Sequence, residues 1–176
     1  MPALTALQLP LPWEDFDLPS PLQTRSTLLV DGPPAWVWSE ATPDFPIAGC
    51  EPGAGASTPG WDLDHVVLMV PNVAEAVATM ADIGLTPRLR MEVKGRPTAF
   101  FRVGPVLEVI ESPVRGPSLY GVALVTEESL EVVVLRWRSL GHEVTDPRDA
   151  LQPGRRIFTV RGTESGLAVM SPDVAR

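Results

Sequence analysis

Residues 61–84 read WDLDHVVLMVPNVAEAVATMADIG, and the order of apolar and polar residues in this stretch decides the fold class. The segment DHVVLMV is a short apolar run, which is typical of a buried strand. Asn72 then stands where a helix N-cap is expected, and Glu75, three residues later, is its capping-box partner. Apolar residues continue at helical spacing as far as Gly84, a residue type that commonly ends a helix. The stretch therefore predicts a strand followed by a helix.

The residues that follow extend this unit. Three more strands are predicted in PRLRMEV, PTAFFRVG and VLEVIES, because the turn signals KGR and GP separate them. After residue 115 the order repeats. YGVALVT is a strand, Thr126 is expected to cap a helix that ends at Gly141, and HEVTDP, RRIFTVRG and GLAVMSP supply strands. We therefore predict an α+β fold of two tandem βαβββ modules, residues 61–115 and 116–176.

Residues 1–60 differ from the modules in composition. They hold eleven of the 20 prolines and seven acidic residues against one arginine, and EPGAGASTPG closes the region as a linker. Short strands are predicted in TRSTLLVDG and AWVWS. The segment LPLPWEDFDLPSPLQ has no period and is expected to run extended over a surface, with Trp13 and Phe16 as anchors; a disordered tail is the alternative. We expect an acidic, proline-rich extension with one or two short strands.

Charge and composition argue against several classes of partner. The formal net charge is −8 and the pI is about 4.7, so nucleic acid, whose phosphates would be repelled, is not an expected partner. No apolar run approaches the roughly 18 residues of a membrane span, and the N-terminus lacks a signal-peptide pattern, so no membrane association and a cytoplasmic location are expected. Cys50 is the single cysteine, which leaves no intrachain disulfide and no cysteine metal cluster.

Several stretches resemble a known superfamily. LDHVVLMVPNVAEAVATMADIGL and FFRVGPVLEVIESP resemble the first module of the vicinal oxygen chelate superfamily, which includes glyoxalase, the extradiol dioxygenases and the bleomycin-resistance proteins. SLGHEVTDPRDALQPGRRIFTVRG is similar to glyoxalase-like domain proteins of bacteria. The resemblance covers about residues 61–172. It implies that the two modules form a curved, mostly antiparallel sheet around a cup, that a divalent metal is held in the cup by the first and last strand of each module, and that homodimers are common.

Carried over position by position, the resemblance gives half of a metal site. The first-module ligand positions fall on His65 and Glu108, whose imidazole and carboxylate suit Fe, Mn, Ni or Zn. The second-module positions fall on Gly121 and Ala168, which cannot bind a metal through their side chains. A bound metal is therefore less expected than none. A third ligand would have to come from outside this frame, and the candidates are Tyr120, Glu111, Glu51 and Cys50.

Four interpretations of His65 and Glu108 stay open. The two residues are partial metal ligands, a metal-free acid–base pair, polar groups that recognise a ligand, or a hydrogen-bonded pair with no present role. In RPTAFFRVG, Phe100 and Arg102 share one strand face and Phe101 lies on the other. If the first face lines the cup, Phe100 and Arg102 would bind an aromatic or anionic substrate; one sequence does not fix this register.

Three other polar sites receive simpler interpretations. The basic pair in PGRR, residues 153–156, would suit phosphate but is expected to be a solvated turn. His142 follows the second helix and is expected at the surface, and Glu111 is expected to be solvated.

The predicted function follows from the cup and its degenerate metal site. We predict a protein of the glyoxalase and dioxygenase type with an unassigned substrate, which binds a small molecule in the cup. The alternatives are a metal-dependent lyase or dioxygenase that uses His65 and Glu108, and a metal-free protein that sequesters its ligand as resistance proteins do. Whether the chain is an enzyme stays open.

Overall fold

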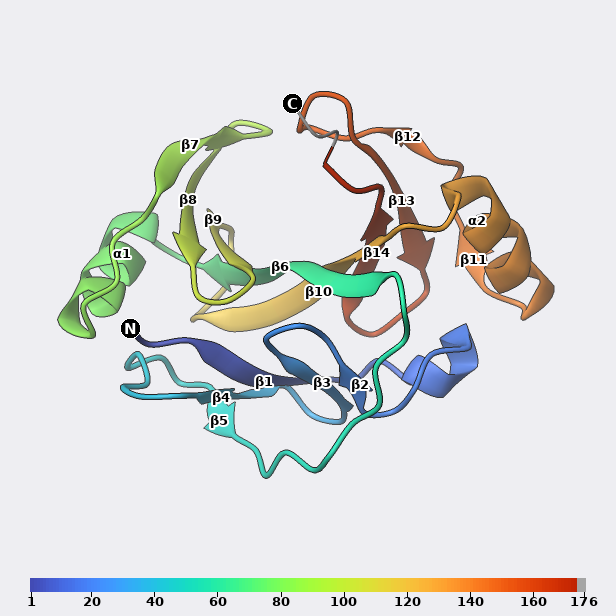
Figure 1. Cartoon of the computed structure of the whole chain (residues 1–176). Coiled ribbons are helices and arrows are strands. Elements are labelled where there is room, and N and C mark those ends of the chain that lie inside the picture. The colour runs from blue at the N-terminus through green and yellow to red at the C-terminus, as the bar shows by residue number, and fades with distance from the viewer. Residues whose placement is uncertain (174–176) are drawn as a thin grey trace.

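A computed structural model describes residues 1–173 (Figure 1). The first module runs as predicted, with one strand, one helix and three strands. Its elements are β6 (Trp61–Val70), α1 (Val73–Asp82), β7 (Leu89–Val93), β8 (Arg96–Arg102) and β9 (Val106–Glu111). The second module adds β10 (Ser118–Thr126), α2 (Leu130–Ser139), β11 (Glu143–Val144), β12 (Arg148–Asp149), β13 (Arg156–Arg161) and β14 (Gly166–Met170). Residues 174–176 of the predicted second module lie outside the described residues.

The strands of both modules form one nine-stranded sheet. Its order is β11-β13-β14-β10-β6-β9-β8-β7, and β12 also pairs with β13. Pairing is parallel at β6–β9 and β10–β14 and antiparallel elsewhere. The sheet curls into a cup with α1 and α2 on its outer side (Figure 1). The predicted α+β fold of two tandem βαβββ modules is confirmed.

A β-bulge lies in each of the two central strands. The pairing of β6 with β10 shifts at Asp64, next to His65, and again at Tyr120, next to Gly121. A bulge changes the alternation of side chains, so two consecutive residues can face the same side of the sheet. Asp64 and His65 both line the inside of the cup. The two bulges occupy matching positions in the two modules, because His65 and Gly121 are matching positions.

The N-terminal region forms a second sheet of five strands rather than one or two. Its order is β2-β3-β1-β4-β5. The strands are β1 (Leu4–Leu9), β2 (Leu22–Gln23), β3 (Leu28–Asp31), β4 (Ala35–Trp38) and β5 (Ala48–Gly49), with a 3-10 turn at Trp13–Phe16. Sequence reasoning missed three of these strands, β1, β2 and β5, and β1 is the centre of the sheet. The apolar and polar residues of β1 do not alternate, because the neighbouring residues Ala6 and Leu7 are both buried, and four of its six side chains are buried in all.

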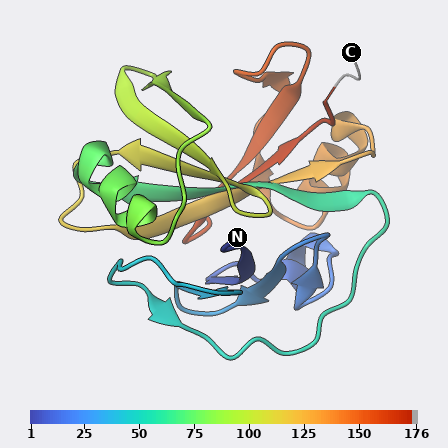
Figure 2. The same cartoon turned by 60° about the vertical axis from the view of Figure 1, so that its left-hand side comes forward.

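The smaller sheet covers the face of β6 and β10 that points away from the cup (Figures 1 and 2). Phe16 packs against Trp137 of α2 with ring centroids 4.9 Å apart, so Phe16 is the anchor that was predicted. His142, expected at the surface, is partly exposed but also contacts the N-terminal region. Its ring stacks on Phe16 at 4.1 Å, and Nε2 lies 2.7 Å from the Asp15 carbonyl oxygen. His142 thus helps to join the two sheets.

The two helices begin differently. Asn72 is the N-cap of α1, as predicted, and its side chain accepts hydrogen bonds from the N–H groups of Ala74 and Glu75. The prediction that Thr126 caps the second helix is wrong, because α2 begins at Leu130. Strand β10 continues to Thr126, which still pairs with Trp61. Among the described residues, no helix combines the length and apolar character that a membrane crossing requires.

Candidate ligand-binding cup

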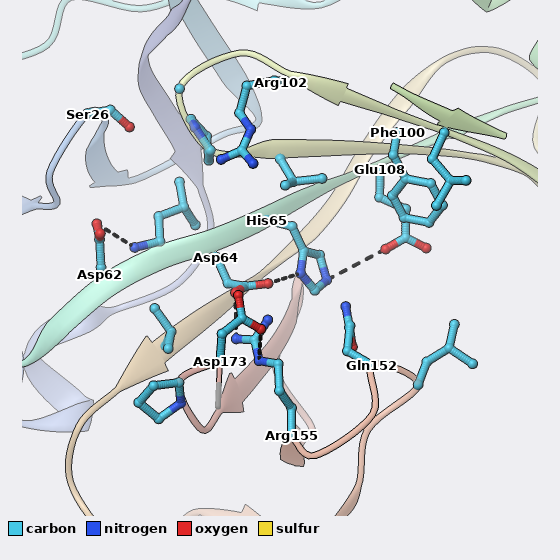
Figure 3. A pocket seen from close by; sticks show the side chains of 18 of the residues that line it. Ser26, Asp62, Asp64, His65, Phe100, Arg102, Glu108, Gln152, Arg155 and Asp173 are labelled. Atoms are coloured by element: carbon cyan, nitrogen blue, oxygen red, sulfur yellow. Dashed lines mark hydrogen bonds and ion pairs between the residues drawn. The ribbon is translucent and has the colours of Figure 1, made fainter. Parts of the chain in front are cut away.

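The cup contains a cavity of about 760 Å³ (Figure 3). Its lining comes from the first module, from the loop before β13, from the N-terminal region, and from Val125, Pro172 and Asp173 of the second module. His65 and Glu108 lie at its floor, and Phe100 and Arg102 line its wall on β8. Leu89 and Met91 of β7 and Leu151 of the loop add exposed apolar side chains.

The register of the sheet explains why His65 and Glu108 meet. Strands β6 and β9 pair in parallel, with His65 opposite Val106 and Val67 opposite Glu108. Glu108 therefore lies two residues beyond the partner of His65 on the neighbouring strand, and its side chain is on the same face of the sheet as that of His65. His65 Nε2 lies 3.6 Å from Glu108 Oε2, and both side chains are about 16% exposed. The structure brings the two predicted residues together at the cavity.

Asp64 and Arg155 hold the His65 imidazole on its Nδ1 side. Arg155 Nη2 donates to Asp64 Oδ1 at 2.6 Å, and Asp64 Oδ2 lies 2.8 Å from His65 Nδ1 (Figure 3). Burial opposes ionisation of Asp64, but hydrogen bonds from His65 and Arg155 outweigh it and hold the pKa of this carboxyl below its ordinary value. An ionised Asp64 accepts a hydrogen bond from the Nδ1–H group of His65, and Nε2 is the ring nitrogen that faces Glu108.

Glu108 has the opposite electrostatic setting. Burial raises the pKa of Glu108 above its ordinary value, although the charges of His65 and Lys94 pull it the other way. No hydrogen bond to the Glu108 carboxylate is present among the described residues. The pair thus combines an imidazole of fixed orientation with a carboxyl group that accepts a proton more readily than usual.

Arg102 and Phe100 face the cavity, and the other face of β8 is core. Ala99, Phe101 and Val103 are 1% exposed or less. Arg102 forms no hydrogen bond or ion pair with its side chain within residues 1–173, so its guanidinium is free to bind an anion. The sequence alone left open which face of β8 lines the cup, and packing of the apolar face in the core decides it. The substrate-binding role of both residues stays a prediction.

The second module does not complete a metal site. Gly121 lies so close to β14 that a Cβ there would overlap the Gly166 carbonyl oxygen, so no ligating side chain fits. The Tyr120 ring covers Gly166, whose own Cβ would stand 2.6 Å from that ring. Ala168 adds only a methyl group. One imidazole nitrogen and one carboxylate remain, which is fewer than the three ligands that a catalytic metal commonly has. These residues do not fit a metal held by the protein.

The candidate third ligands lie elsewhere. Glu111 accepts a hydrogen bond from the Val73 N–H at the start of α1, so it is not the solvated residue that was predicted. Glu51 and Cys50 lie in the linker after β5. Across residues 1–173, no group of three or more histidine, cysteine, aspartate or glutamate side chains is placed to hold a metal ion.

Sequence reasoning missed Asp64 and Arg155. Arg155 is 6% exposed, so the prediction that the basic pair forms a solvated turn is wrong for this residue. Arg156 is partly exposed and pairs with Glu131. Asp64 precedes His65 and would face the opposite side of a regular strand, so only knowledge of the bulge would have placed both in the cup. Because Arg155 and Asp64 are far apart in sequence, no local pattern links them.

Comparisons with known proteins support the fold. No family model matches the chain, and no curated protein matches it. Among solved structures, methylmalonyl-CoA epimerase from Mycobacterium tuberculosis aligns with a TM-score of 0.53 and 18% identity over 64% of this chain and 88% of that chain. A hypothetical protein from Bacillus halodurans aligns with a TM-score of 0.54 and 17% identity over 66% of this chain and 97% of that chain. A Streptomyces coelicolor methylmalonyl-CoA epimerase variant bound to 2-nitronate-propionyl-CoA aligns with a TM-score of 0.51 and 15% identity over 64% of this chain and 97% of that chain.

These similarities concern the fold. The epimerases are members of the vicinal oxygen chelate superfamily, so the glyoxalase-like fold that the resemblance implied is confirmed. About a third of this chain lies outside each alignment.

Proposed function

We propose that the chain binds a small organic anion in the cup, against His65 and Glu108, without a metal ion held by the protein. The observation that carries this proposal is the cavity of about 760 Å³, which places this pair, a free arginine and an apolar wall on one surface. Ligand pockets commonly measure about 300–1,000 Å³, so a small molecule fits. Binding of acyl-CoA molecules by epimerases of the same fold supports the proposal.

Each part of the cavity suits one part of such a ligand. The Arg102 guanidinium presents a planar fork of donors that matches a carboxylate. Leu89 and Met91 offer apolar surface on the neighbouring strand β7, on the same face of the sheet as Phe100, which pairs with Leu89. His65 and Glu108 would take the polar group in the middle of the ligand, such as a hydroxyl or a carbonyl. The predicted class is therefore an anion with an apolar body.

Calorimetric titration of chelator-treated protein with a panel of aryl and alkyl carboxylates tests the proposal. Wild type should bind members of the panel, and Arg102→Gln and His65→Ala should each weaken binding by about tenfold or more. Arg161→Gln is the matched control, because Arg161 is an exposed residue of β13 that pairs with Glu143. The proposal is wrong if no member binds, if both cup variants bind as wild type does, or if binding requires an added divalent metal.

A second candidate function is proton exchange at a carbon next to a carbonyl group of the ligand. The fixed orientation of His65 favours it. Nε2 would take the proton, the electron pair of the C–H bond would move into the carbonyl to give an enolate, and a protonated Glu108 would return a proton to carbon. Two groups 3.6 Å apart approach the carbon from one side, so this geometry favours exchange with retention over inversion.

Solvent exchange tests this second function directly. Incorporation of deuterium from D2O into a bound ketone or keto acid, followed by NMR, should fall by about 100-fold or more in His65→Gln. Glu108→Gln should also slow the exchange. Exchange at the wild-type rate in His65→Gln would leave binding as the function of the cup.

A further inference from the structure

One end of the cup is built by the N-terminal region. The turn Thr24–Thr27 between β2 and β3 reaches the cavity with Arg25 and Ser26. Thr24 Oγ1 donates to the Thr27 carbonyl at 2.7 Å, and Thr27 Oγ1 donates to the Leu4 carbonyl at 2.9 Å. Both threonines are buried. The turn is therefore held in place by buried hydrogen bonds to its own sheet.

Two contacts fix this turn against the cup. The Arg25 backbone N–H donates to Asp62 Oδ1 of β6 at 2.9 Å. On the other side, Ser26 lies against Gly104 in the turn between β8 and β9, where a Cβ would stand 3.0 Å from Ser26 Oγ. Ser26 and Arg102 accordingly lie at the same end of the cavity, away from Phe100 and Glu108 (Figure 3).

Arg25, the neighbour of Ser26 in this turn, lines the same cavity as Arg102, so the cavity has a second guanidinium group besides that of Arg102. The Arg25 side chain is 86% exposed and lies 3.3 Å from Asp62 Oδ2. An exposed ion pair of this kind is weak in water, so the guanidinium can exchange Asp62 for an anionic ligand. Arg102 has no competing carboxylate among the residues that the structure describes. The apolar side chains Leu89 and Met91 stand on β7, two strands away from β9 and close to Phe100.

We infer that Arg25 and Arg102 together bind a dianionic group of the ligand, so that the N-terminal region determines specificity for doubly charged anions with an apolar body. This inference rests on the proposed binding of an anion in the cup. One guanidinium pairs with one carboxylate in a bidentate manner, and two guanidinium groups at one end match two carboxylates or one phosphate ester.

A matched pair of probes tests the inference. Benzylmalonate is 3-phenylpropionate with a second carboxylate, and benzyl phosphate carries its two charges on one group. Calorimetry on the full chain should show that Arg25→Gln weakens both dianions by about tenfold and weakens 3-phenylpropionate by less than about threefold. Asp62→Asn removes the competing charge but keeps an oxygen for the Arg25 N–H, so it should strengthen dianion binding. Arg161→Gln should change none of the three affinities.

The outcomes separate this inference from the proposed function. Equal effects of Arg25→Gln on the affinities for the two dianions and for 3-phenylpropionate would overturn the role of Arg25. If Arg102→Gln still weakened binding of the dianions and of 3-phenylpropionate, the proposed binding of an anion in the cup would stand. Failure of wild type to bind any of the three probes, or any carboxylate of the panel, would overturn both. A preference for benzyl phosphate over benzylmalonate, with loss in Arg25→Gln, would support the inference and assign the dianion as a phosphate.

Discussion

Arg155 and Asp64 form an ion pair whose side chains are 5% and 17% exposed. Removing one partner of such a pair leaves a buried charge without compensation. We therefore predict that Arg155→Ala lowers the free energy of unfolding by about 3 kcal/mol in denaturant titrations. Arg156→Ala, which removes the partly exposed neighbour, should change it far less. Equal effects of the two substitutions would contradict the role of the buried pair.

Glu108 leads to a prediction about pH. Its pKa is raised on folding by burial, so the unfolded chain ionises Glu108 more readily than the folded chain does. Its contribution to stability is thus fully present below the unfolded pKa of about 4.3 and is lost as pH rises through the folded pKa. Glu108→Gln should match wild type in acid and become the more stable protein at neutral pH. Unfolding free energies of both proteins from pH 4 to about pH 8 would show this.

That pH profile also bears on the interpretation of the His65–Glu108 pair. A carboxyl group that lowers stability at neutral pH is not explained by a structural role, whereas functional sites commonly carry such groups. Asp64 should behave oppositely, because its pKa is lowered on folding. It stabilises the folded protein at pH values above its unfolded-state pKa, and this stabilisation is lost as the pH falls through its folded-state pKa. If Glu108→Gln is less stable than wild type at neutral pH, the pair is a structural one.

At the scale of elements, close contact between β10 and β14 decides what the cup can hold. A Cβ on Gly121 would overlap the Gly166 carbonyl oxygen, so Gly121→Ala should separate the two strands and destabilise the protein by about 1–3 kcal/mol. Gly116→Ala is the matched control, because a Cβ there meets nothing within 4 Å. Thermal unfolding of the two variants measures the difference. A stable Gly121→Ala protein would mean that a metal ligand is sterically allowed at this position.

The same elements show how far the sequence predicts the structure. The strand and helix of residues 61–84 follow from periodicity and from Asn72, because both signals act within a few residues. The bulge at Asp64 and the register of β8 depend on packing across the sheet, which no local pattern encodes. The pairing of His65 with Glu108 was predictable only through the resemblance, and that of Arg155 with Asp64 was not predictable at all.

At the scale of the whole molecule, the two sheets share one apolar core. Trp137 of α2 contacts Phe16 of the N-terminal region, Trp61 of β6 and Phe158 of β13. This continuity explains why a region that looked extended in sequence is ordered: its leucines and aromatics cover the outer face of the central strands. The proline-rich composition hid these short strands.

A shared core should unfold as one unit. Phe16→Ala leaves a large cavity between the sheets and is expected to cost about 3–5 kcal/mol. The midpoints of unfolding measured by tryptophan fluorescence and by far-UV circular dichroism should decrease by the same amount and stay coincident. Leu135→Ala, at an exposed position of α2, should change neither. Separate transitions for the two signals would show that the N-terminal sheet unfolds on its own.

The central proposal is that the cup binds an organic anion at His65 without a metal held by the protein. The chain has only two histidines, so long-range 1H–15N spectra of histidine-labelled, chelator-treated protein observe His65 with His142 as an internal reference. We predict that Nδ1 of His65 carries a proton and that addition of benzylmalonate or 3-phenylpropionate shifts Nε2 of His65 while His142 stays unchanged. Ring signals of His65 that ignore the ligand, or that respond only after a divalent metal is added, would contradict the proposal.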